Sequence, residues 1–374
     1  MSVAVFAYRA STVLFILGAL ILVFGRQGYK DGVFYKMIVW TLISIFISVI
    51  PAYLYYGQSL FESIRACTSL SFGLIYYFLL KQWKFPEENL LNIIKWICVI
   101  WVVLELGQQI TYPRIWFSNT FSRLGEVPER MGLYRVYIWG IDFVMIAFSY
   151  YLGKMISNGR KKKDVLLFLL FFAGILCYCS RKHILTCLFA IAFSVLQTSG
   201  SKKIMYGIFV TAIFIFLYVN FYDTYHEMST EVQAAQGEGG DFIRFISAKF
   251  FLFDYSAEPL YPLWGAGIPG GVGGLFLYTD YLGQDLGIYQ ADVGIIGYYS
   301  MVGLLGVSAI MMYIVKFIKN WRYIDNWFKY FFIMKMFLIV FDFWAIWGVG
   351  MFAYAVFLYM LELNIKKNKE FALS

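Results

Sequence analysis

The chain has 374 residues, of which 61% are hydrophobic, 21% aromatic and only 14% charged, and its formal net charge is +8. Soluble domains are close to half apolar and about a quarter charged. The composition therefore excludes a cytosolic enzyme, a nucleic-acid-binding protein and a disordered chain.

Apolar runs long enough to cross a bilayer recur along nearly the whole chain. The hydrocarbon core leaves no water for unpaired backbone groups, so each run is predicted to be a helix. We expect an all-α polytopic integral membrane protein with about 11 (10–12) transmembrane helices, forming a single membrane domain over residues 1–374. The predicted spans are 4–24, 37–56, 61–80, 91–110, 133–153, 165–180, 183–197, 204–222, 291–315, 329–347 and 349–363.

The basic residues predict the orientation, because inner loops of membrane proteins carry an excess of Lys and Arg. With the N-terminus outside, twenty of the 31 basic residues fall in the inner connections and the tail. This orientation requires the apolar block 165–197 to be two short helices with a tight outer turn at 180–183. One long span would instead move the basic cluster 316–329 and the C-terminal tail to the outside. The net charge is therefore mostly an orientation signal.

The predicted outer connection 111–132 carries basic residues on the side that the charge rule disfavours. Arg114 and Arg123 lie within it. Arginines at a membrane boundary either contact lipid headgroups or bind an anionic substrate. Both interpretations stay open from the sequence.

The connection 223–290 is predicted to be a large outer loop that carries short helices. A loop of this length without a function is unusual. Its segment 241–253 is apolar with Arg244 interspersed, which indicates an interfacial helix. A glycine-proline stretch follows, in which Gly265 and Gly267 are expected to shape a sharp turn.

Neither a nucleotide cofactor nor a metal is expected. Gly265-Ala-Gly267-Ile-Pro-Gly270 matches G-x-G-x-x-G in letters, but that fingerprint needs a preceding strand and a βαβ unit. The only two histidines, His183 and His226, do not form an H-E-x-x-H motif. A carboxylate-only site stays open as a weaker alternative to a solvated acidic surface, among Asp223, Glu227, Glu231 and Asp241.

Arg181 is the most informative single cation. A lone arginine between two apolar helices is costly unless it is paired or hydrated. It either reaches the lipid headgroups or grips an anion, since its planar guanidinium suits phosphate oxygens. Arg123, Arg181 and Arg244 lie on three separate outer segments. Their convergence would make an anion site for a lipid-linked diphosphate at the membrane surface.

Four pieces of the sequence carry a resemblance to a known family. They are Arg123-Leu-Gly125-Glu-Val-Pro128, Cys179-Ser180-Arg181, Arg244 with Pro262-Leu-Trp-Gly265-Ala-Gly267, and Asp292-Val-Gly294-Ile-Ile-Gly297 with Gly303 and Gly306. Arg114 and Gly125 add an R-x10-G spacing. In this order, and with the predicted span count and the large late loop, the sequence resembles the bacterial O-antigen polymerase (Wzy-type) and O-antigen ligase superfamily over most of its length.

The resemblance implies a metal-independent glycosyltransferase at the outer face of the bacterial cytoplasmic membrane, with the C-terminus in the cytoplasm. It would transfer a growing glycan from undecaprenyl diphosphate to a lipid-linked repeat unit. Basic side chains would hold the diphosphate and stabilise its charge as it leaves. The residues predicted for this role are Arg114, Arg123, Arg181 and Arg244.

The resemblance also implies a base that takes the proton of the acceptor hydroxyl. Asp292 is the first choice, because the ligases of the family have a histidine in about that place. The presence of Asp292 instead of that histidine favours a polymerase over a ligase. A helix N-cap is the alternative role for Asp292. The further candidates for the base are Glu258, Asp241 and His226.

The expected partners are an undecaprenyl-diphosphate-linked oligosaccharide, membrane lipid and a chain-length regulator protein, and no nucleic acid or cofactor is expected. An O-antigen ligase of the same superfamily is the first alternative, and a polysaccharide or lipid transporter or flippase is the second. Transporters place ionisable residues near the bilayer midplane and often show repeated halves. The sequence has no visible repeat, and its intramembrane ionisable residues are scattered as Glu105, Asp142, Lys335, Asp342 and Glu362.

Overall fold

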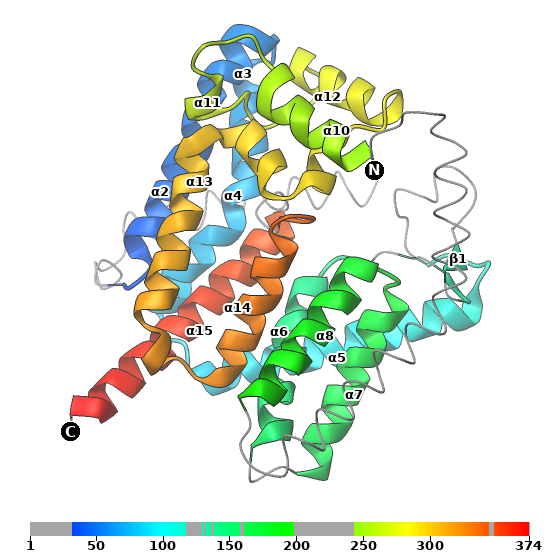
Figure 1. The fold of residues 1–374 in the computed structure, drawn as a ribbon, viewed down its shortest axis with the longest axis vertical. Coiled ribbons are helices and arrows are strands. Elements are labelled where there is room, and N and C mark those ends of the chain that lie inside the picture. The colour runs from blue at the N-terminus through cyan, green and yellow to red at the C-terminus, as the bar shows by residue number, and fades with distance from the viewer. Residues whose placement is uncertain are drawn as a thin grey trace. The chain divides into compact units, whose positions relative to one another are not determined.

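The structure of the protein is a computed structural model (Figure 1), and its described residues are mostly helical. Within that part of the chain, two short antiparallel strands, β1 (Glu129–Arg130) and β2 (Leu133–Tyr134), are the only strands. The predicted all-α class is confirmed. The structure describes residues 32–116, 129–130, 132–134, 136, 138–157, 161–197, 243–343 and 348–373, so the predicted spans 4–24 and 204–222 lie outside it.

Five helical segments in the described part of the chain are long and apolar enough to cross a membrane. They coincide with the predicted spans 37–56, 61–80, 91–110, 291–315 and 349–363. The segments are Tyr35–Tyr56, which comprises α2 (Tyr35–Ile47) and α3 (Val49–Tyr56), then α4 (Leu60–Gln82), α5 (Glu87–Thr111), α13 (Ile295–Lys319) and α15 (Gly348–Leu373).

The break between α2 and α3 has a local cause. Pro51 lies four residues after Ile47 and has no N–H to donate to its carbonyl, so the helical ladder is interrupted at Ser48. The chain continues in nearly the same course, and Gly57 ends α3 in the left-handed conformation with φ of +63°. Pro51 therefore interrupts this apolar segment without ending it.

Shorter helices occupy the predicted spans between these segments. α7 (Lys162–Cys177) and α8 (Arg181–Leu196) confirm that the block 165–197 is two helices, but their turn lies at residues 178–180 and not at 180–183. α6 (Ile141–Ile156) begins later than the predicted residue 133, because the preceding segment forms β2 and then Gly140 at φ of +116°. α14 (Asn326–Leu338) follows in the predicted span 329–347.

The described residues fall into two compact units, a division that the sequence did not indicate. The first unit contains those within Met1–Glu87, Asp241–Ile324 and Ile339–Ser374, and the second those within Glu88–Gly240 and Asp325–Leu338. The first is built on α4 against α15 and on α13 against α2, and the second on α6 against α7 and on α14 against α8.

Small residues allow the closest helix contacts, as is usual where helices pack in a membrane. A Cβ atom on Gly73 of α4 would collide with the backbone of Phe352 in α15. In the second unit, a Cβ atom on Gly174 of α7 would lie against Val102 of α5 at 3.3 Å or less. Glycine at these positions lets the paired helices approach at backbone distance.

Three of the intramembrane ionisable residues are paired. Lys335 of α14 forms an ion pair with Asp142 of α6. Glu362 of α15 forms ion pairs with Lys81 and Lys366, each with 2.9 Å between Oε1 and Nζ. Paired charges in apolar surroundings satisfy each other. The prediction that the intramembrane ionisable residues are scattered is therefore wrong for these three.

Candidate functional site

The first unit carries a folded segment at residues 243–294, here called the platform. It contains α10 (Ile243–Lys249), η2 (Phe250–Asp254), α11 (Tyr261–Trp264), α12 (Gly274–Gln284) and η3 (Gln290–Val293). Figure 1 shows α10, α11 and α12 gathered beside α3 and the start of α13. The large loop therefore carries short helices, as predicted. Its own buried apolar side chains, packed with Ala52 of α3, include Phe251, Tyr255, Tyr261, Leu275, Leu282, Ile288 and Val293.

The glycine stretch after α11 binds the platform to α13 through backbone atoms. The N–H of Ala266 donates to the carbonyl of Ser300 at 2.8 Å, and the N–H of Gly267 to that of Met301 at 3.0 Å. Gly265 and Gly267 have φ of +74° and +104°, where L-residues are strained. A Cβ atom on Gly265 would collide with the backbone of Met301. This is the physical reason for glycine at both predicted turn positions.

α13 has a matching interruption. Gly303 has φ of +63° and ψ of −165°, which breaks the regular course of the helix. A Cβ atom on Gly303 would collide with the carbonyl of Leu263 in α11. The kink therefore exposes the backbone of residues 300–303 to the glycine stretch. Gly265-Ala-Gly267-Ile-Pro-Gly270 follows a helix rather than a strand, so it lacks the structural context of a dinucleotide fingerprint.

Arg244 and Asp292 lie on neighbouring elements of the platform. α10, which carries Arg244, packs against η3, which carries Asp292, and both side chains are half-buried. The N-cap role for Asp292 is wrong. α13 begins at Ile295 with Gly294 as its N-cap, and no side chain caps it. Asp292 instead lies inside the turn of η3, two residues before the cap.

Glu258 lies in a group of tyrosines. Its half-buried side chain is beside the Tyr55 side chain of α3, and its carbonyl accepts the N–H of Tyr261 at 3.0 Å. Burial raises the pKa of Tyr255 and Tyr278, so these phenols stay protonated. Protonated phenols donate hydrogen bonds and do not act as bases. Carboxylates are therefore the candidate bases of the platform.

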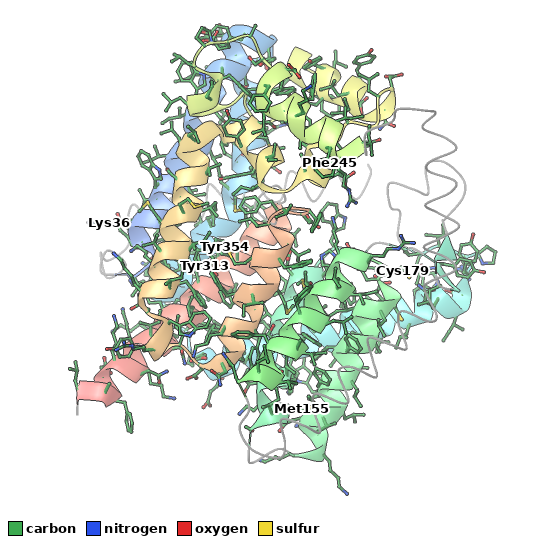
Figure 2. The ribbon with its side chains drawn as sticks, viewed as in Figure 1. Lys36, Met155, Cys179, Phe245, Tyr313 and Tyr354 are labelled. Carbon is green, nitrogen blue, oxygen red and sulfur yellow. The ribbon has the colours of Figure 1, made fainter. Side chains whose placement is uncertain are left out.

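Arg181 lies in the second unit as the first residue of α8. The turn before it contains Cys179 at φ of +52°, labelled in Figure 2, and Ser180, whose Oγ lies 2.7 Å from Nδ1 of the buried His183. Arg181 itself is half-buried. The first N–H groups of a helix carry partial positive charge, and a guanidinium beside them favours an anion at this position.

Two glutamines of α5 were not assigned a role from the sequence. Gln108 donates to the carbonyl of Arg114 at 2.9 Å and accepts the N–H of Trp116 at 2.7 Å. Gln109 accepts the N–H of Tyr134 at 2.8 Å and donates to its carbonyl at 2.7 Å. These amides hold both ends of the segment 112–138, whose Arg114 side chain is exposed.

Glu105 lies one helical turn earlier on the same helix. It is fully buried, and its Oε1 accepts the N–H of Ile138 at 3.3 Å. Among the residues that the structure describes, its Oε2 has no hydrogen-bond partner. Positions 105, 108 and 109 share one helix face through the i, i+3 and i+4 spacing. Three polar residues at that spacing in an apolar helix are the sequence signal that could have identified this group.

The structure brings some of the predicted residues together in the first unit, places others in the second unit, and leaves the rest outside the described residues. Arg244, Asp292 and Glu258 belong to the platform of the first unit, with Gly265 and Gly267. Arg181 and Arg114 belong to the second unit. The convergence of Arg123, Arg181 and Arg244 stays a prediction. Arg123, Asp241 and His226 lie outside the described residues, as do Asp223, Glu227 and Glu231.

The fold defines an all-α protein whose apolar helices indicate membrane association. No model of a known protein family matches the sequence, and no curated protein matches it. The case for a function therefore depends on the residues and the geometry described above.

Proposed function

We propose that the protein is an oligosaccharide repeat-unit polymerase. It transfers a growing glycan from undecaprenyl diphosphate to a lipid-linked repeat unit at the outer face of the bacterial cytoplasmic membrane. In the transfer, the acceptor hydroxyl oxygen bonds to C1 of the donor sugar, and the bond from C1 to the diphosphate oxygen breaks. The diphosphate leaves with the electron pair, and a base takes the hydroxyl proton.

The platform is the observation that carries this proposal. Three of the four sequence pieces that resemble the superfamily lie on separate elements of residues 243–306 and pack against one another. They are the α10 helix with Arg244, the stretch 262–267, and the turn with Asp292 followed by α13. This supports a site with a cation for the diphosphate and a carboxylate for the acceptor proton.

Arg181 and Arg114 complete the proposed anion-binding set, together with Arg123. Arg181 opens α8, where the helix terminus and the guanidinium both favour an anion. Arg114 is exposed on the segment held by Gln108. Asp292 is the first candidate base and Glu258 the second. A membrane lipid substrate suits arginines at helix ends, because its diphosphate lies at the bilayer boundary.

The charged helix ends of the first unit support the proposed orientation. Lys81 at the end of α4 and Lys366 near the end of α15 share Glu362, and Lys316 near the end of α13 contacts Val33 before α2. One end of this unit is therefore basic. The positive-inside rule assigns that end to the cytoplasm, with the N-terminus outside and the C-terminus inside.

The test replaces Arg181 or Arg244 with Ala in the native host and separates lipid-linked and surface glycans by size. We expect long chains to disappear and single lipid-linked units to accumulate. Lys249→Ala is the matched control, because it removes an exposed cation from the same helix α10. Normal chain length in both arginine variants would contradict the proposal.

Gene deletion and reconstitution distinguish the alternatives. A ligase mutant keeps long lipid-linked chains, whereas a polymerase mutant has only single units. A transporter or flippase would need an energised vesicle, while a polymerase forms polymer from lipid-linked units in a static one. The pairing of Asp142 with Lys335 and of Glu362 with two lysines favours structural roles for these intramembrane charges.

A further inference from the structure

Two helices of the first unit bring lysines near their ends to one buried carboxylate. Glu362 of α15 is 2% exposed, and its Oε1 lies 2.9 Å from Nζ of Lys81 in α4 and 2.9 Å from Nζ of Lys366 in α15. Its Oε2 accepts the hydroxyl hydrogen of Tyr77. Both carboxylate oxygens of Glu362 therefore already have partners within the protein.

A third lysine, Lys316, lies near this carboxylate, and a fourth, Lys36, lies near Lys316. Lys316 of α13 donates to the backbone carbonyl of Val33, and it is close enough to Lys36 of α2 and to Glu362 for their charges to act on it. Lys36, labelled in Figure 2, is exposed, as is nearly half of the Lys366 side chain. We call Lys36, Lys81, Lys316 and Lys366 the lysine cluster.

The lysine cluster has an excess of positive charge. The four ammonium groups together with the Glu362 carboxylate have a net charge of +3. Lysines that only follow the positive-inside rule spread into water, where repulsion is weak. Here the side chain of Lys81 is 9% exposed, so repulsion is screened less. An anion bound at the solvent-exposed side of the cluster, where Lys36 and Lys366 lie, would reduce this repulsion.

Phosphate oxygens suit several ammonium donors at once, and basic sites between membrane helices at the cytoplasmic side bind lipid headgroups. Apolar surface begins at the same helix ends. Trp83, directly after α4, is 59% exposed, and Ile318 in the last turn of α13 is 58% exposed. Acyl chains can cover such side chains, whereas a free phosphate ion cannot.

We propose that the lysine cluster binds the phosphate headgroup of an anionic phospholipid from the cytoplasmic leaflet. This site is distinct from the proposed glycosyl-transfer site and does not depend on it. Lys36 and Lys316 contact the lipid phosphate from the open side. Lys81 and Lys366 hold Glu362 and supply the field that attracts the anion.

Native mass spectrometry of the purified full-length chain in neutral detergent tests the site. Phosphatidylglycerol and phosphatidylcholine with the same acyl chains are titrated separately, and inorganic phosphate is added as a competitor. We expect at least tenfold tighter binding of phosphatidylglycerol. The double variant Lys36→Gln/Lys316→Gln should weaken phosphatidylglycerol binding roughly 30-fold, because it removes the contributions of two lysines to binding an anionic lipid. It should leave the affinity for phosphatidylcholine unchanged.

Lys162→Gln/Lys163→Gln is the matched control, because it removes two exposed lysines at the start of α7 and should leave both affinities unchanged. Glu362→Gln raises the excess charge and should tighten phosphatidylglycerol binding, a gain that misfolding does not produce. Equal affinity for the two lipids would overturn the proposal. Displacement of phosphatidylglycerol by millimolar inorganic phosphate would assign the site to free phosphate instead.

Discussion

The two units hold their connecting segments in different ways. In the first unit, the platform has its own apolar side chains and joins α13 through backbone atoms at Gly265, Gly267 and Gly303. In the second unit, side-chain amides of α5 bind the backbone of Arg114, Trp116 and Tyr134. The platform therefore depends on close approach of backbones, whereas these three residues depend on amide partners for their backbone polar groups.

This difference predicts which substitutions each unit tolerates. In the platform, replacing glycine hydrogen by a side chain at a backbone contact should lower the free energy of unfolding through collision. In the second unit, removing a buried polar or charged partner should lower the free energy of unfolding by leaving groups unsatisfied.

The largest expected effect is that of Gly303→Ala. The new Cβ would collide with the carbonyl of Leu263, and φ of +63° with ψ of −165° is a conformation that only glycine adopts readily. We expect the free energy of unfolding to fall by about 6 kcal/mol, from about 3 kcal/mol of backbone strain and about 3 kcal/mol of collision, measured as loss of thermal stability in detergent.

Gly57→Ala is the control for this substitution. Gly57 has the same φ of +63°, but a Cβ atom there would meet nothing within 4 Å. We expect a loss of about 1 kcal/mol from the backbone conformation alone. Equal losses for the two variants would show that backbone approach does not hold the platform.

Breaking the ion pair of the second unit should have the next largest effect. Lys335→Met leaves the Asp142 carboxylate without its cation, and Lys335 is 4% exposed. Loss of one member of a buried pair costs about 3–5 kcal/mol. Thermal unfolding in detergent measures the change, and the double variant Asp142→Leu/Lys335→Met should recover most of it. A double variant as unstable as the single one would refute the electrostatic cause.

Gln109→Ala should loosen only the segment around Tyr134 in the second unit. It removes one partner from each backbone group of Tyr134, whose carbonyl keeps the N–H of Val136 as a donor, and costs about 1–3 kcal/mol locally. Hydrogen exchange should increase at residues 133–138. Asn92→Ala is the control, because Asn92 is exposed on the same helix. Unchanged exchange at Tyr134 would mean that the amide does not hold this segment.

The smallest expected effect is at a single side-chain hydrogen bond in the first unit. Trp40 of α2 donates its indole N–H to Oγ of Ser308 in α13 at 2.7 Å. Hydrogen bonds between membrane helices contribute about 0.6 kcal/mol on average. A double-mutant cycle of Trp40→Phe and Ser308→Ala measures this coupling. A coupling above that of the Lys335 ion pair would reverse the order of contributions.

The apolar segments that match the prediction best are Tyr35–Tyr56 and α4, whose bounds differ from the predicted spans 37–56 and 61–80 by two residues or fewer. Their register follows from the need to satisfy every backbone group within the helix. The start of α6 was predicted too early, because an apolar run does not reveal where a strand pair and Gly140 precede the helix. The turn before α8 was placed slightly too late, because the polar residues that suggested it form the first turn of the helix itself.

The candidate site was predictable in part. Arginines on the predicted outer side stand out from the sequence, since the charge rule disfavours them there. The role of Gln108 and Gln109 was not predicted, because an amide in an apolar helix does not indicate which backbone it will meet. The N-cap role of Asp292 failed for a similar reason, since an offset of two residues decides whether a carboxylate caps a helix or lies in the preceding turn.

The sequence by itself determined that the protein is an all-α chain with apolar helices, because hydropathy acts locally and needs no partner. Only the tertiary structure decided that Glu362 joins Lys81 and Lys366, that Asp142 joins Lys335, and that the glycine stretch meets the kink of α13. Such pairings join positions far apart in the chain. They depend on which helix faces come together, which periodicity and composition do not specify.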